Sequence, residues 1–191
     1  MAHIHFNGAS GNVAAGKYND GSEAMRPVLA ERLATGMKRA WEATVKAPIA
    51  AADLSWRAQP VKLPPAEHLD ADKLRATLDD PQADYTLRLA TASKLAWLQH
   101  SARAIDLGCL RLGNVYVLHM PGELFVEYQL AAQKLRPKDT VCMAAYGDYG
   151  PGYIGTEVAY AQSGYETSPG ASNVAPSVER VLLKAIEELL K

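Results

Sequence analysis

The chain has 191 residues, with 20 lysines and arginines against 21 aspartates and glutamates, and a formal net charge of −1. Its 48% hydrophobic and 21% charged residues are the proportions of an ordinary soluble globular protein, and they exclude disorder along the whole chain. The near-zero charge argues against nucleic acid as a partner, because binding phosphates needs an excess of Lys and Arg. The length favours one domain spanning residues 1–191.

No stretch of the sequence predicts a membrane or secretion signal. A transmembrane helix needs ~20 apolar residues, and no segment approaches that length. Residues 1–6 lack the basic flank and apolar core of a signal peptide. Cys109 and Cys142 each lie in an apolar, strand-like run, which is typical of buried thiols in a reducing compartment. We therefore expect a cytoplasmic protein without a transmembrane segment.

The first half of the chain reads mainly as helices. We expect a short strand over 2–6, a loop rich in Gly and Asn over 7–23, a helix over 23–46 capped by Ser22 or Asp20, an extended segment over 53–63, and helices over 70–79 and 82–104.

The second half mixes strands and helices. Two apolar runs, 105–112 and 115–120, flank the dipeptide Gly113-Asn114, a pattern that predicts a hairpin with a two-residue turn. We then expect a helix over 122–135, a strand over 139–146, a segment rich in Gly and Tyr over 147–173, and a final amphipathic helix over 176–190. This mixture predicts an α/β layered domain whose mixed sheet includes a hairpin and is packed by amphipathic helices.

Two polar or glycine-rich regions follow predicted strands, where scaffolded sites usually lie. One is the loop 7–21, which matches neither a phosphate-binding nor a dinucleotide-binding fingerprint. The other joins Pro121-Gly122-Glu123 to the segment 147–153. Seven tyrosines lie between residues 116 and 165, and their hydroxyls can donate hydrogen bonds, move protons or bind a metal.

Glu123 has two interpretations. A carboxylate at the start of the predicted helix is favoured by the helix dipole, and that is the ordinary one. The other is a metal ligand at the end of a strand. His119 precedes Glu123 by four residues and either joins the same site or fills the sheet. His3 and His5 share one face of a predicted strand, a spacing that suits a metal, but a frayed or solvent-facing terminus is the stronger interpretation.

Three blocks of the sequence resemble one enzyme family in their order and spacing. They are Phe-Asn-Gly-Ala-Ser-Gly-Asn-Val-Ala-Ala-Gly over 6–16, Leu-His-Met-Pro-Gly-Glu-Leu-Phe over 118–125, and Tyr-Ile-Gly-Thr-Glu-Val-Ala-Tyr over 153–160 with Tyr165-Glu166 beyond it. The family is that of the neutral/alkaline non-lysosomal ceramidases, in particular its bacterial ceramidase-like members. The blocks span residues 6–166, most of the chain.

The resemblance implies the zinc-dependent amidase domain of these enzymes. Glu123 is similar to the glutamate ligand of the zinc and Tyr153 to the tyrosine ligand, with a zinc-bound water attacking an N-acyl amide. The position of the family's catalytic serine holds Ala14. The family's histidine ligands precede the first block, so the chain resembles the C-terminal half of the domain, without the family's additional C-terminal domain. Three protein ligands are usual for catalytic zinc, so a third would come from His3, His5, His119 or another subunit.

Our leading hypothesis is therefore a hydrolase of ceramidase-like ancestry that cleaves an acyl amide or ester in a small acyl-containing substrate. Zinc would be held by Glu123, Tyr153 and His119. The candidates for positioning or proton transfer are Tyr146, Asp148 and Tyr149.

Two alternatives remain. The chain is a non-catalytic, truncated module whose exposed apolar surface is covered by a partner or by a second copy, which predicts a homo-oligomer. Or it is a metal-free hydrolase with Ser10 as nucleophile.

Overall fold

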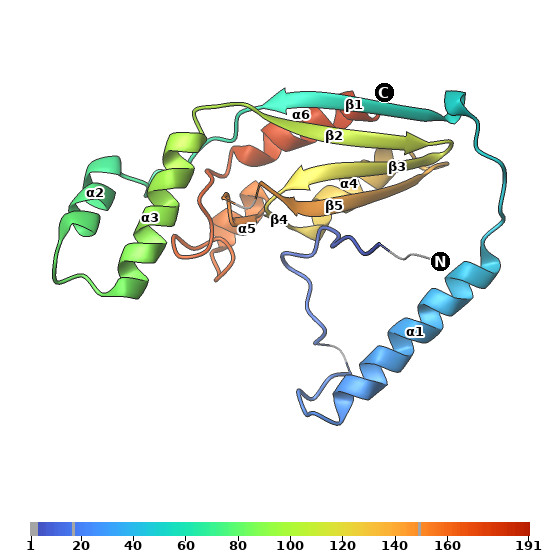
Figure 1. Ribbon diagram of the computed structural model, residues 1–191, viewed down its shortest axis with the longest axis horizontal. Coiled ribbons are helices and arrows are strands. Elements are labelled where there is room, and N and C mark those ends of the chain that lie inside the picture. Colours follow the sequence, from blue (N-terminus) through green and yellow to red (C-terminus); the bar gives the residue numbers. More distant parts are fainter. Residues whose placement is uncertain (1–3, 17, 149) are drawn as a thin grey trace.

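A mixed sheet lies at the centre of the computed structural model, which describes residues 4–16, 18–148 and 150–191 (Figure 1). The sheet has four strands in the order β1-β2-β3-β5. Their bounds are Leu54–Val61 for β1, Ile105–Leu112 for β2, Val115–Pro121 for β3 and Thr140–Gly147 for β5. β1, β2 and β3 are antiparallel, whereas β3 and β5 are parallel. The predicted α/β class, with a mixed sheet and a hairpin, is confirmed.

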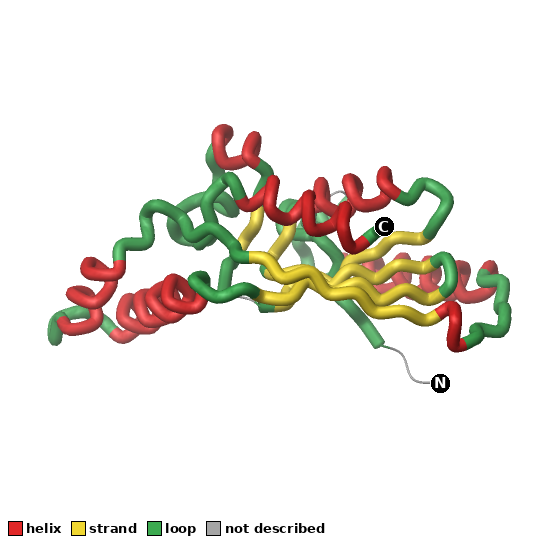
Figure 2. Tube along the Cα trace, turned by 90° about the horizontal axis from the view of Figure 1, so that it is seen from above, coloured by secondary structure: helices red, strands yellow, loops and turns green. Residues whose placement is uncertain are grey.

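Short-range sequence signals account for both connections within this sheet. The β2–β3 turn places Gly113 at φ +63°, a conformation that glycine adopts without steric cost. The parallel strands β3 and β5 need a crossover, and helix α4 (Val126–Leu135) supplies it. Helix α6 (Val178–Leu189) contacts β1, β2 and α4. Both helices lie on one face of the sheet, and the opposite face carries no helix layer (Figure 2).

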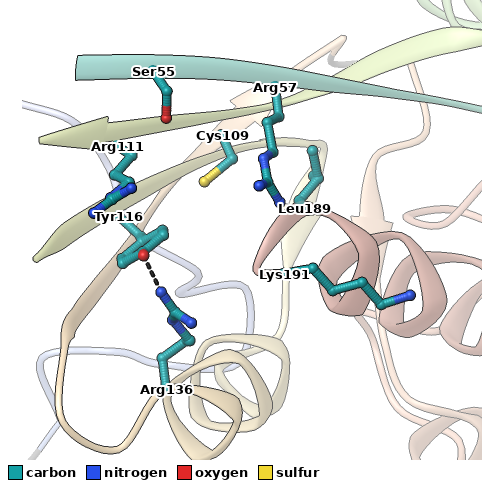
Figure 3. A pocket seen from close by; sticks show the side chains of 8 residues that line it. All are labelled: Ser55, Arg57, Cys109, Arg111, Tyr116, Arg136, Leu189 and Lys191. Atoms are coloured by element: carbon teal, nitrogen blue, oxygen red, sulfur yellow. Dashed lines mark hydrogen bonds between the residues drawn. The ribbon is translucent and has the colours of Figure 1, made fainter. Parts of the chain in front are cut away.

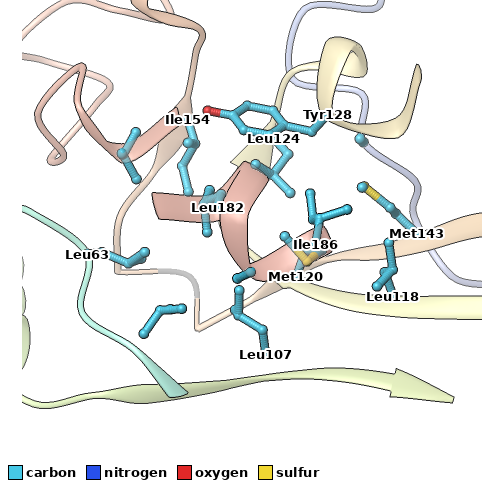
Figure 4. Close-up of a cluster of buried hydrophobic side chains, with 14 of the residues drawn as sticks. Leu63, Leu107, Leu118, Met120, Leu124, Tyr128, Met143, Ile154, Leu182 and Ile186 are labelled. Carbon is cyan, nitrogen blue, oxygen red and sulfur yellow. The ribbon is translucent and has the colours of Figure 1, made fainter. Parts of the chain in front are cut away.

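The core lies between this helix-covered face and the two helices (Figure 4). Leu182 and Ile186 of α6 are fully buried and approach Met120 and Leu107 of the sheet. Each such side chain contributes ~1.5–3 kcal/mol by leaving water. Tyr128 of α4 is also buried, and its hydroxyl donates a 2.9 Å hydrogen bond to the Gly155 carbonyl. This hydrogen bond links α4 to the segment that follows β5.

That following segment contains regular structure of its own. A second, two-stranded parallel sheet pairs β4 (Glu123–Leu124) with β6 (Tyr153–Ile154). Helix α5 (Glu157–Gln162) comes next, capped by the Thr156 side chain. Isolated bridges then join Gly152 to Ser172 and Pro65 to Val174, so the segment is anchored on both sides.

The remaining helices lie away from the helix-covered face of the sheet. Helices α2 (Ala71–Asp79) and α3 (Tyr85–His100) pack against each other, and Asp70 and Asp84 cap their first turns. Helix α1 (Met25–Ala43) has no buried residue, and the short 3-10 helix η1 (Ala51–Asp53) precedes β1. Among the described residues, no helix is both long enough and apolar enough to cross a membrane.

Three local predictions are wrong. No strand forms at residues 4–6, the described part of the strand expected over 2–6. The N-cap of α1 is Ala24, because the Asp20 carboxylate instead accepts a bond from the backbone N–H of Ser22 within the loop. Cys142 is exposed rather than buried, since it lies on the sheet face without a helix layer; Cys109 is buried, and both thiols are free.

Glu123 does not begin a helix, contrary to the prediction of a helix over 122–135. It lies in β4, and the helix starts at Val126. The parallel pairing with β6 holds residues 123 and 124 extended, and this long-range contact is invisible to helical periodicity. The helix-dipole explanation of the Glu123 carboxylate is therefore removed.

Candidate active site

Three segments distant in sequence meet at the carboxyl ends of β3 and β5 (Figure 1). The N-terminal loop is attached there by two backbone bonds, from Ala145 N–H to the Asn7 carbonyl at 2.9 Å and from Gly11 N–H to the Leu124 carbonyl at 2.8 Å. The third segment is β6, which pairs with β4. These are the three blocks on which the sequence resemblance rests, and the fold brings them together.

Glycines make this close approach possible. Gly122 has φ +58°, and a Cβ there would lie 2.7 Å from the Gly152 carbonyl oxygen. A Cβ on Gly11 would lie only 2.4 Å from the Glu123 carbonyl oxygen. Both distances are shorter than real side chains tolerate, so the turn after β3 and the contact of the N-terminal loop with β4 each depend on glycine.

Glu123 and Tyr153 are register partners in the β4–β6 pair. The pKa of the Tyr153 hydroxyl is raised, first by loss of solvent around it and then by the charge of Glu123 and the hydrogen bond to that carboxylate; Tyr165 and Tyr146 add smaller effects. The phenol therefore stays protonated at neutral pH and donates to the carboxylate. The Tyr165 ring lies edge-on to the Tyr153 ring, with 6.0 Å between centroids and 73° between planes.

Ser10 and Tyr146 form a second pair beside the first. Their hydroxyl oxygens are 3.2 Å apart, which is within hydrogen-bond distance. Tyr146 has φ +68°, a left-handed conformation that is costly for a residue with a side chain and that occurs often at functional sites. Ala14, which the resemblance places at the serine position, is exposed, and the hydroxyl that the loop brings to this cluster belongs to Ser10. We call Ser10, Glu123, Tyr146 and Tyr153 the tyrosine cluster.

The other predicted site residues that the structure describes are not part of this cluster. His119 is exposed, and its imidazole lies over Gly147, where a Cβ would be 2.6 Å from Nε2. Asp148 is exposed with φ +42°. Tyr149 and His3 fall outside the described residues. His5 is exposed and lies 3.1 Å from the Asn7 amide oxygen.

A hollow of about 370 Å³ lies beside α3, and one of its lining residues, Asp148, follows Tyr146 of the cluster by two positions. It lies between α3 and the loop after β5, and Ala96, Trp97, His100 and Asp148 help to line it. Trp97 is fixed there by a 2.9 Å bond from its indole N–H to the Asn173 carbonyl. The lining is mainly apolar, as a site for an acyl chain would require.

A catalytic zinc normally takes three protein ligands. Glu123 and Tyr153 are adjacent oxygen donors. Within residues 4–16, 18–148 and 150–191, no three His, Cys, Asp or Glu side chains come together in a group that could hold a metal. The described side chains as placed therefore do not complete a zinc site.

Comparisons with known proteins agree with the fold. No protein-family model and no curated protein matches the sequence. Among solved structures, neutral ceramidase from Pseudomonas aeruginosa is similar over 97% of this chain, with a TM-score of 0.60 and 15% sequence identity. The chain has a ceramidase-like fold.

The chain spans 36% of the length of that enzyme. A ceramidase complexed with C2 is similar over 46% of the chain and 14% of its own length, with 19% identity and a TM-score of 0.40, too low to support an argument. At these identities the likeness establishes the fold alone.

Two contributors to the site were missed by sequence reasoning. Tyr165 was noted only as part of a block, yet its ring contacts Tyr153. Asn12 accepts from the backbone N–H of Val126 at 2.8 Å and donates to the Glu127 carboxylate at 2.9 Å, so the loop caps α4. A capping residue usually directly precedes its helix, whereas Asn12 lies more than 100 positions upstream, and no local pattern could reveal it.

Proposed function

We propose that the chain is a hydrolase of ceramidase-like ancestry that cleaves an acyl amide or ester bond. The observation that carries this proposal is the meeting of the three resembling blocks, which places the Glu123–Tyr153 pair beside the Ser10–Tyr146 pair. The ceramidase-like fold supports it independently, because it spans 97% of the chain.

Each member of the tyrosine cluster has a role that its surroundings favour. Glu123 is the acceptor for a proton, and Tyr153 is kept neutral as a donor. Tyr146 can donate to the oxygen of a polarised carbonyl, because its hydroxyl already takes part in a hydrogen bond at this point. Ser10 offers an oxygen nucleophile in the metal-free form of the reaction. We assign positioning of the substrate to Asp148 and Tyr149, which directly follow the cluster in sequence.

We further propose that zinc assists this reaction. Glu123 and Tyr153 would be two of its ligands, and the third would be His119, at the same end of the sheet, or a residue of another subunit. A bound zinc would act as a Lewis acid and lower the pKa of a coordinated water. The carboxylate and phenol oxygens are suitable zinc ligands. To provide the third ligand, His119 would have to move or a second chain would have to contribute a residue.

The substrate we propose is a small molecule with an apolar acyl chain, seated in the hollow beside Trp97. Its scissile carbonyl would lie at the tyrosine cluster. Tyr146 of that cluster precedes Asp148, which lines the hollow, by two residues. The mainly apolar lining selects for hydrocarbon rather than for a charged group.

The test is a panel of N-acyl amides and acyl esters of increasing chain length, assayed with added zinc and with a chelator. We expect hydrolysis that Tyr153→Phe lowers at least tenfold, because the donor hydroxyl is lost. The matched control is Tyr85→Phe, whose side chain is exposed on α3 and remote from the cluster. Loss of activity in chelator and recovery with zinc supports the zinc form, whereas unchanged activity supports the metal-free form with Ser10. No hydrolysis of any substrate contradicts the proposal.

A second candidate is a non-catalytic module that binds a partner or a second copy. Uncovered apolar side chains favour it: Leu33, Met37 and Trp41 of α1 are 66%, 57% and 46% exposed. Trp56 on β1 is 61% exposed, on the strand at the edge of the sheet. Patches of this kind mark interfaces. Light scattering on the purified chain tests this candidate. An oligomer that dissociates when Trp56→Ser or Trp41→Ser is introduced supports it. A monomer without hydrolytic activity leaves only binding to a different protein.

A further inference from the structure

A cluster of positive side chains surrounds one cavity of the sheet (Figure 3). It lies near the β2–β3 turn, at the opposite end of the sheet from the tyrosine cluster. Ser55, Arg111 and Tyr116 are register partners across β1, β2 and β3, and they line one cavity. Tyr116 precedes Pro121 by five residues, roughly 17 Å along a strand. The cavity is therefore separate from the proposed active site.

The cavity is small and rich in cations. Its volume is about 130 Å³, several times what one water molecule needs. Arg57, Arg111, Arg136 and Lys191 line it, and none of its lining residues is acidic. Such a concentration of positive charge is unexpected in a chain whose formal net charge is −1.

Neighbouring groups hold two of these cations in place. Arg136 Nε lies 3.0 Å from an Asp139 carboxylate oxygen, and an Nη of Arg136 donates to the Tyr116 hydroxyl, drawn as a dashed line in Figure 3. Lys191 Nζ lies 2.6 Å from the Glu188 carboxylate. Asp139 and Glu188 thus compensate Arg136 and Lys191.

Arg57 and Arg111 are not compensated in this way. Arg111 donates from Nε to the Gly113 carbonyl at 2.8 Å, which orients its guanidinium without neutralising it. In the part of the chain that the structure describes, neither arginine forms an ion pair. Both side chains are partly open to solvent and line the cavity beside Cys109 (Figure 3). Burial raises the pKa of the Cys109 thiol, and the charges of Arg57 and Arg136 lower it.

The fold alone does not require these two arginines. Helices α4 and α6 end near the cavity, and a helix C-terminus carries about half a negative charge, so cations are favoured beside it. Arg136 and Lys191 directly follow the ends of α4 and α6, so the helix dipoles account for positive charge at these two positions. Arg57 and Arg111 are on strands, where no helix end accounts for them.

We propose that this cavity binds a phosphate group, either free phosphate or the phosphate end of a small monoester. Two guanidinium groups on neighbouring strands offer paired N–H donors, the geometry that suits a phosphate oxygen pair. The Ser55 and Tyr116 side chains line the same cavity. The volume fits a small oxyanion and excludes a bulky ligand beyond the phosphate itself. The proposal does not depend on hydrolase activity.

Calorimetric titration of the full chain tests this proposal, with sodium phosphate and glycerol phosphate as probes and sodium chloride at matched ionic strength as the blank. We expect saturable binding of phosphate and at least a tenfold weaker affinity in Arg57→Gln and in Arg111→Gln. The matched control is Arg88→Gln, an exposed position on α3, which should bind as the wild type does. Tighter binding of glycerol phosphate than of phosphate assigns the site to a monoester, and the reverse order assigns it to the free anion.

Two results would overturn the proposal. One is heat from phosphate no greater than from chloride. The other is an unchanged affinity in Arg57→Gln and Arg111→Gln when their circular dichroism matches the wild type. If a glutamine variant does not fold, Arg57→Lys replaces it, because lysine keeps the charge and loses the paired donors. We expect it to bind more weakly than arginine, and an equal affinity counts against the proposal.

Discussion

The contact between the N-terminal loop and β4 yields a sharp prediction at Gly11. An alanine there would place its Cβ 2.4 Å from the Glu123 carbonyl oxygen and 3.1 Å from that of Leu124. Neither neighbour can turn away, because both are backbone atoms of a paired strand. Overpacking of this kind costs ~1–3 kcal/mol. Since Gly→Ala elsewhere gains ~0.4–1 kcal/mol, we expect Gly11→Ala to lower the free energy of unfolding by about 1–2 kcal/mol.

Urea denaturation measures this change, and Gly8→Ala in the same loop is its control. A Cβ at Gly8 meets nothing within 4 Å, so this variant should be as stable as the wild type or slightly more stable. Gly11→Ala should also disturb the Ser10–Tyr146 contact and lower any hydrolytic rate, whereas Gly8→Ala should not. Equal stability of the two variants would refute the docking of the loop on β4.

Three further predictions concern single side chains. Tyr128→Phe should cost about 1–2 kcal/mol in the same denaturation assay, because it leaves a buried carbonyl without its donor. A thiol reagent should modify Cys142 quickly and Cys109 only on unfolding, so a native Cys142→Ser chain that still reacts would contradict the burial of Cys109. Ultraviolet titration should show Tyr153 ionising at lower pH in Glu123→Gln, since a neighbouring negative charge is removed. Because the folded pKa of Tyr153 is raised, its neutral form stabilises the fold below about pH 10, and that stabilisation is lost as the pH rises through the folded pKa.

Periodic patterns along the chain predicted most of the regular structure. The four-residue spacing of apolar side chains identified α1 and α6, and the Gly113-Asn114 dipeptide identified the β2–β3 hairpin, because both signals are local. The strand pair β4–β6 was missed, since each strand has two residues and exists only through its partner 30 positions away. The helix expected over 122–135 failed at its start for the same reason.

The candidate site was predictable in its residues and not in its arrangement. The family resemblance pointed to Glu123 and Tyr153, and Tyr146 was a candidate for positioning or proton transfer; the structure brings these three side chains near one another. The place of Ser10 beside Tyr146 was not predictable, because it depends on how the N-terminal loop folds back across β5. His119 alternates on β3 with side chains that face the helices, so its strand position turns it towards the uncovered face.

The measurement that tests the central claim most directly is the rate of fatty-acid release from one fluorogenic N-acyl amide by the purified chain and two matched variants. Glu123→Gln removes the carboxylate of the tyrosine cluster with little change in shape, and Glu187→Gln removes an exposed carboxylate on α6. We predict release by the wild type and by Glu187→Gln, and a loss of at least a hundredfold in Glu123→Gln. Equal rates in all three chains would place the activity elsewhere, and no release by any of them, with or without zinc, would contradict a hydrolytic role for the cluster.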